Sequence, residues 1–130
     1  MDGRNTACIA NDAKRLVLPV AASTSIVEGH LVALDAGYAV LATKNTDLIA
    51  IGRAETSADN SKGKAGDVSV EVLRGVFLWD NDTTNAVTQE HVGGNCYMSD
   101  SHTVSSLETG SSVAGKVLGF EDDQVMVETL

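Results

Sequence analysis

Aromatic residues, prolines and long apolar runs are all scarce in this chain of 130 residues. It contains one tryptophan, two tyrosines, two phenylalanines and one proline. Any core must therefore be built from small aliphatic side chains. Long uncharged stretches such as Leu16–Val27 are interrupted by Pro19 and by serine and threonine. No stretch reaches the ~20 apolar residues of a transmembrane helix.

Basic residues are half as frequent as acidic ones, 9 against 18, which gives a net charge of −9. Nucleic-acid-binding proteins need a basic face to displace counterions from phosphates, so this composition argues against that class. It also argues against adhesion to anionic membranes. The charge is uneven along the chain. Residues 1–75 carry 8 basic and 9 acidic groups, whereas residues 76–130 carry 9 acidic groups and only Lys116.

The two cysteines, Cys8 and Cys96, stand far apart and form no Cys-x-x-Cys pair. This usage predicts reduced thiols in a cytosolic setting. The opening residues Met1–Thr6 have neither the basic nor the apolar region of a secretory signal peptide. We therefore expect the protein to be made in the cytoplasm.

Valine, threonine, glycine and serine dominate instead, which favours strands separated by turns. The clearest strand is Asp67–Leu73, where valines alternate with mostly polar residues. Two apolar runs joined by Asp35–Gly37 predict a hairpin. Further strands are expected at 14–20, 31–34, 38–41, 48–54 (with Gly52 as a bulge or close approach), 76–79, 96–99, 103–105, 112–121 and 124–129.

The segments between these runs are predicted to be mostly irregular. Thr56–Gly66 and Asp80–Asn85 are predicted loops, and Val87–Gly94 is predicted to hold one helical turn. Many short strands separated by turns, with almost no amphipathic helix between them, are typical of all-β proteins. We predict a small β-barrel or β-sandwich of short, mostly antiparallel strands. A single domain over residues 14–130 would follow an extended N-terminal arm, residues 1–13, which either frays or reaches a neighbouring subunit.

Two stretches superficially match ligand-binding motifs. Gly110–Lys116 has the skeleton of a phosphate-binding loop, but Val117 stands where serine or threonine should bind magnesium, and a strand follows. We interpret it as a loop entering a glycine-containing strand. Asp80–Asn85 resembles the start of a calcium loop, but Asn85 and His91 occupy the places of the required glycine and glutamate. An Asx-rich turn with side chains capping backbone amides explains it better, with an incidental surface cation as the alternative.

The remaining reactive side chains form no recognisable constellation. The three histidines lack zinc-ligand spacing, and no serine lies in a nucleophile elbow. Cys96 is expected to be buried, while Trp79 is either an interface anchor or a core residue. We accordingly predict no catalytic, cofactor-binding or metal-binding residue, and no enzyme activity. The histidines are His30, His91 and His102.

The order of several segments resembles the capsid cement, or head decoration, proteins of tailed bacteriophages. The resemblance covers about residues 15–130. Each piece is a generic β motif, and the order of all of them is what carries the likeness. The start departs from the family pattern, because Met1–Ala13 is longer than the opening of related chains. The segments are Glu28–Val40, Ile51–Glu55, Gly66–Phe77, Cys96–Met98 and Ala114–Phe120, followed by a final valine strand.

This resemblance implies a β protein on the outer surface of the virion, bound where major capsid subunits meet. The implied partners are the major capsid protein and further copies of the chain itself, as a homotrimer or, second, a homodimer. The near-neutral part would then make the contacts, and the acidic part would face solvent. Two other functions remain open: a tail- or fibre-associated β module that binds a host surface glycan, and a small hydrolase.

Overall fold

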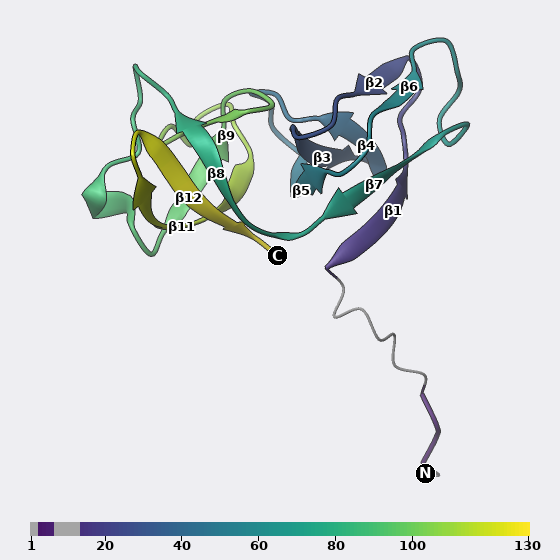
Figure 1. Cartoon of the computed structure of the whole chain (residues 1–130), viewed down its shortest axis with the longest axis horizontal. Coiled ribbons are helices and arrows are strands. Elements are labelled where there is room, and N and C mark those ends of the chain that lie inside the picture. Colours follow the sequence, from purple (N-terminus) through teal and green to yellow (C-terminus); the bar gives the residue numbers. More distant parts are fainter. Residues whose placement is uncertain (1–2, 7–13) are drawn as a thin grey trace.

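A computed structural model describes residues 3–6 and 14–130, and in these the chain is all-β, as predicted. Two lobes lie side by side, and the chain passes between them along the β7–β8 ribbon (Figure 1). The first lobe contains β1 (Arg15–Pro19), β2 (Thr24–Ile26), β3 (Leu31–Asp35), β4 (Tyr38–Leu41), β5 (Ile49–Ala54), β6 (Ala58–Asn60) and β7 (Ser69–Leu73). The second contains β8 (Gly75–Asn81), the 3-10 helix η1 (Gln89–His91), β9 (Asn95–Met98), β10 (Thr103–Ser105), β11 (Val113–Glu121) and β12 (Gln124–Thr129).

The first lobe is a strongly curled sheet with strand order β1-β7-β5-β3-β4. Its two outer strands approach each other, because Val20, just beyond β1, bridges Ala39 of β4. A separate ribbon of β2 and β6 packs beside it. The interior is filled by small aliphatic side chains, as the shortage of aromatics requires. These are Val20, Ile26, Val32, Ala39, Ala54, Val70 and Val72.

The second lobe is a closed barrel with strand order β10-β8-β12-β11-β9. All of its pairings are antiparallel except β10 with β8. Closure leaves no free sheet edge in this lobe, so every barrel strand has two neighbours. The predicted mostly antiparallel pairing is therefore confirmed, and the second lobe takes the barrel form.

Strand β3 connects the cores of the two lobes. Its side chains alternate between faces, as strand geometry requires. Val32 belongs to the buried cluster of the first lobe, whereas Leu31 and Ala33 belong to the buried cluster that fills the barrel, together with Trp79 and Val125. All three β3 residues are 0% exposed. The four-residue apolar run in the sequence is thus a strand buried on both sides.

Two predicted details of the turns and bulges are confirmed. The hairpin at 35–37 closes through a two-residue loop, since Asp35 pairs with Tyr38. Gly52 lies at a register shift between β3 and β5. A Cβ atom there would lie 2.2 Å from the Leu73 carbonyl oxygen, and φ is +152°. Only glycine lets β5 and β7 approach so closely.

Two sequence predictions are wrong about the irregular segments. The predicted loop Thr56–Gly66 contains β6, which pairs with the unpredicted β2. Both strands are three residues long and mostly polar, so no hydrophobic alternation revealed them. The loop predicted to start at Asp80 starts only after Asn81, because β8 continues to that residue. Asp80 pairs with Gln124 of β12. The predicted helical turn is confirmed as η1.

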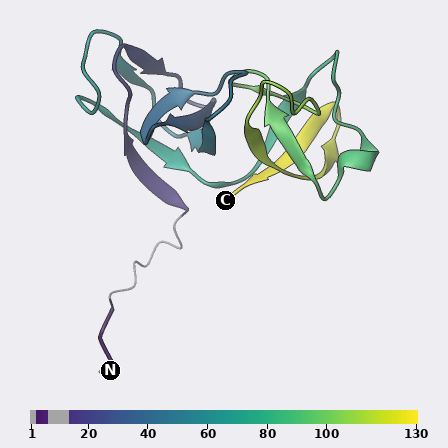
Figure 2. The same cartoon turned by 180° about the vertical axis from the view of Figure 1, so that it is seen from behind.

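The predicted arm, residues 1–13, lies mostly outside the described residues. Within it, residues 3–6 are exposed and belong to no helix or strand. Figure 2 shows the C-terminal end of the chain near the junction of the two lobes. In the described part of the chain, no helix has the length and apolar character needed to span a membrane.

Gly115 is predicted to be intolerant of a side chain, because its Cβ would lie 2.3 Å from the Glu128 carbonyl oxygen. We expect Gly115→Ala to lower the free energy of unfolding by about 1–3 kcal/mol in urea denaturation. Gly119→Ala is the matched control, because a Cβ atom at this position of the same strand would meet nothing within 4 Å. That variant should stay within about 0.5 kcal/mol of the wild type. Equal effects would contradict the steric explanation.

Candidate functional site

The uneven charge of the sequence is also uneven in space. Residues 76–130, with their 9 acidic groups and single Lys116, make up essentially the whole barrel. The first lobe, residues 14–75, carries 7 basic and 7 acidic groups. One end of the molecule is therefore strongly negative and the other is balanced. A partner approaching the two ends meets different electrostatic fields.

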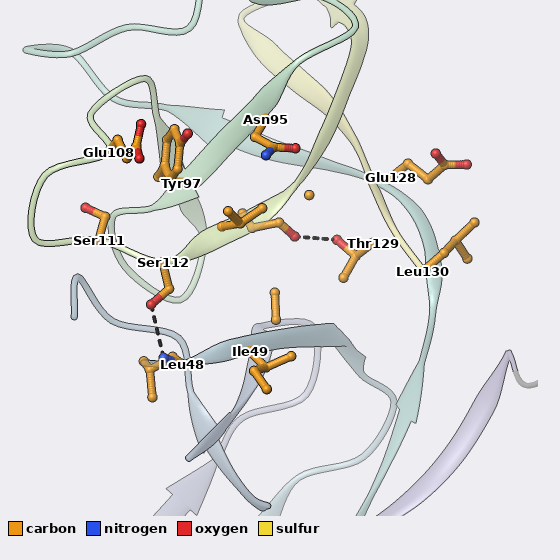
Figure 3. Close-up of a pocket in the computed structure, with 14 residues that line it drawn as sticks. Leu48, Ile49, Asn95, Tyr97, Glu108, Ser111, Ser112, Glu128, Thr129 and Leu130 are labelled. Atoms are coloured by element: carbon orange, nitrogen blue, oxygen red, sulfur yellow. Dashed lines mark hydrogen bonds between the residues drawn. The ribbon is translucent and has the colours of Figure 1, made fainter. Parts of the chain in front are cut away.

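A groove separates the lobes and encloses about 540 Å³ (Figure 3). It is the candidate functional site, because several large exposed apolar side chains border it. Ile49 is 65% exposed, Leu130 66% and Val113 42%. Exposed apolar side chains that gather at a concave surface are typical of interaction sites. The groove is lined by residues 48–50, 111–115 and 128–130, together with Asn95, Tyr97 and Glu108.

One wall of the groove is the side of β5 that faces away from β3. Beyond Gly52, Arg53 and Ala54 pair with β7 on this side. Ile49 and Ala50 pair with β3 alone among the described strands, and Ile51, at the register shift, is paired with neither β3 nor β7. The reason is that β7 leaves the first lobe and becomes β8 of the barrel. Strand β5 therefore presents a short unpaired edge where the groove is located.

The charged groups that line the groove are acidic. Glu108 and Glu128 are the charged side chains among the described lining residues, and no lysine or arginine is among them. Burial raises the pKa of the Tyr97 hydroxyl, and the Glu108 carboxylate raises it further. Tyr97 is therefore a neutral hydrogen-bonding group at neutral pH. The groove combines apolar side chains, a neutral phenol and negative charge.

Ser112, one of the lining residues, joins the two lobes beside the groove. Its hydroxyl donates to the Asn45 carbonyl oxygen at 2.6 Å and accepts from the Leu48 amide at 3.1 Å. The serine belongs to the barrel and both partners belong to the first lobe. These two hydrogen bonds form a clamp that holds the segment just before β5 against the start of β11.

A second clamp joins the lobes through two histidines that are 72 positions apart in the sequence. His30 Nδ1 lies 2.7 Å from the Ser101 hydroxyl oxygen. The Leu31 amide donates to the Ser101 carbonyl oxygen at 2.7 Å. The His102 ring stands edge-on to the His30 ring, with centroids 5.9 Å apart. His102 Nδ1 also lies 3.1 Å from an Asp80 carboxylate oxygen.

The third histidine does not join this cluster. His91 lies on η1, where its Nδ1 accepts from the Thr88 amide at 2.8 Å. It therefore caps a local turn. The contact between His30 and His102 could not be predicted from their spacing in the sequence, because the two residues belong to different lobes.

The two stretches that resemble ligand-binding motifs, Gly110–Lys116 and Asp80–Asn85, have structural roles. Gly110 lies in a loop, while Gly115 and Lys116 lie within β11, so the strand interpretation is confirmed. In the other stretch, the Asp82 carboxylate accepts from the Asn85 amide at 2.7 Å. The Asn81 side chain bonds the amide and carbonyl of Val87. These bonds confirm the Asx-rich turn.

Trp79 and Cys96 both belong to the core. Trp79 is 4% exposed and packs against Phe77, so its core interpretation is the one the structure supports. Cys96 is a free, fully buried thiol, as expected, and burial raises its pKa to about 12. Burial and a neutral thiol make it unreactive. Cys8 lies outside the described residues.

Within residues 3–6 and 14–130, no group of three or more His, Cys, Asp or Glu side chains is arranged to hold a metal ion. No protein-family model matches the chain, and no curated protein or solved structure matches it either. The groove's own chemistry, apolar side chains beside an open strand edge, is that of an interaction surface.

The His30–Ser101 bond is predicted to couple the lobes energetically. We expect a double-mutant cycle of His30→Ala and Ser101→Ala, followed by urea denaturation, to give a coupling energy of about 1 kcal/mol. Each single variant leaves one partner of a half-buried bond unpaired. His91→Ala combined with Ser101→Ala is the matched control, because these side chains belong to separate clusters. Additive effects for His30 and Ser101 would show that this clamp does not stabilise the junction.

Proposed function

We propose that this protein is a capsid cement protein of a tailed-bacteriophage head. It binds the outer surface of the shell where major capsid subunits meet and stabilises the expanded state. The observation that carries this proposal is the groove between two joined lobes, bordered by exposed Ile49, Val113 and Leu130. The ordered likeness of its segments to head decoration proteins supplies the class of partner.

The mechanism would be multivalent binding to a lattice. Each copy contacts more than one shell subunit, and each contact can be modest because the others hold it at high effective concentration. Binding only the expanded shell lowers the free energy of that state by linkage. Two lobes with a shared core suit this role, because β3 would connect the shell contacts made by one lobe to those made by the other.

Self-association extends the same mechanism. A homotrimer would match the threefold positions of a shell, and a homodimer would match its twofold positions. The acidic barrel supports solubility at high copy number, and the balanced first lobe supports close contact with the shell. The protein would be made in the host cytoplasm and end on the virion surface.

Two other functions receive less support. A glycan-binding module would use exposed aromatic side chains at its site, yet Phe77 and Trp79 are buried in the core and the exposed Tyr38 does not line the groove. A hydrolase would need an activated nucleophile. Ser101 and His30 are within hydrogen-bond distance, but the neighbouring ring of His30 is His102 and not an orienting carboxylate. The short Ser–His contact is better explained as a clamp between the lobes.

The proposal is tested by binding to heads assembled from the major capsid protein of the same phage. We expect the protein to cosediment with expanded heads and only weakly with unexpanded ones, because the contacts between major capsid subunits differ in the two states. Light scattering of the free protein should show a trimer or dimer. Bound protein should raise the temperature at which the heads break open. A monomer that fails to bind expanded heads would overturn the proposal.

A separate prediction concerns the N-terminal segment. Residues 3–6 are exposed in the isolated chain, which suits a segment that reaches a neighbouring subunit. We expect deletion of residues 1–12 to lower retention on expanded heads while leaving the circular dichroism spectrum and melting temperature unchanged. Replacing the same residues by a glycine-serine stretch of equal length controls for linker length. Unchanged occupancy would exclude a role for the arm.

A further inference from the structure

We infer that the interlobe groove binds an extended, basic segment of the major capsid protein as an added β-strand on β5. This inference rests on the proposed function and names the surface through which it acts. Its support comes from three features of the groove: an open backbone edge, exposed apolar side chains and charged lining residues that are acidic.

The open edge supplies backbone hydrogen-bonding groups. Ile49 and Ala50 pair with β3 on one side and, among the described strands, have no partner on the other. A strand that adds to such an edge gains main-chain hydrogen bonds whatever its sequence. The barrel offers no comparable place, because its sheet is closed. The edge is also short, so it suits a segment of a few residues and does not invite a long intermolecular sheet.

The apolar side chains supply the contacts that select the segment. Ile49 is 65% exposed, and Figure 3 shows its side chain beside the groove, across from Leu130 and Thr129. Alternate residues of an added strand would point toward the groove floor and contact these side chains. Small aliphatic residues fit this position, since Val113 forms part of the opposite wall.

Negative charge defines the rest of the chemistry. Glu108 and Glu128 approach the groove from the barrel, and no basic residue is among its described lining. An incoming lysine or arginine would find two carboxylates and the neutral hydroxyl of Tyr97. An acidic segment would be repelled, both here and by the surrounding barrel. The expected ligand is therefore an extended segment with small apolar residues and at least one basic residue.

Binding to expanded heads tests the inference. We expect Ile49→Arg to weaken binding by about tenfold or more, because it places a bulky cation in the contact region. Glu108→Lys should weaken binding by about tenfold and reduce its dependence on salt. The matched controls are Leu118→Arg, another exposed apolar position in the barrel, and Glu121→Lys, another exposed acidic one. Both controls should bind within about twofold of the wild type.

A photo-crosslinking residue at position 49 identifies the occupant directly. Crosslinking on expanded heads followed by mass spectrometry should recover a basic segment of the major capsid protein. Recovery of a peptide from another copy of this chain, with loss of the oligomer in Ile49→Arg, would overturn the inference and assign the groove to self-association. Equal binding by Ile49→Arg and wild type would overturn it while leaving the cement function intact. Wild-type protein that binds no heads would overturn both.

Discussion

The structure depends on one strand that is buried on both faces. Val32 of β3 fills the first lobe, while Leu31 and Ala33 complete the core of the barrel. Neither lobe could be separated without exposing this strand to water, at a cost of roughly 25 cal/mol per Å² of apolar surface. The His30–Ser101 and Ser112–Asn45 contacts lie on the periphery of this shared wall. They orient the lobes, and β3 holds them together.

The groove is a geometric consequence of that arrangement. Because β7 must leave the first lobe to become β8, it covers β5 only at Arg53 and Ala54. Gly52 allows this crossing, since its missing side chain makes room for the Leu73 carbonyl. The remaining edge of β5 faces β11 and the end of β12 without pairing to them. Because this edge is recessed, strands of other proteins cannot readily pair with it. A short extended segment that fits the groove still can.

The elements of the fold were predictable where side chains alternate or where a turn has a clear chemistry. The valines of β7 and the Asp35–Gly37 hairpin are examples. The mostly polar strands β2 and β6 were not, because three-residue strands carry too little pattern. The groove was beyond prediction for another reason. Ile49 looks like an ordinary strand residue, and its exposure depends on where a strand distant in sequence turns away.

The uneven charge gains a physical meaning from the two-lobe architecture. If residues 1–75 and 76–130 had formed one intermixed domain, the nine acidic groups of the second half would have been distributed over the whole molecule. Instead they surround a barrel that forms one wall of the groove, while the opposite wall belongs to a balanced lobe. The local attraction for a basic segment therefore comes with a repulsion between barrels of neighbouring copies. Such repulsion favours contact between copies through the first lobe and disfavours barrel-to-barrel packing, so the same charge that guides the ligand also restricts how copies assemble.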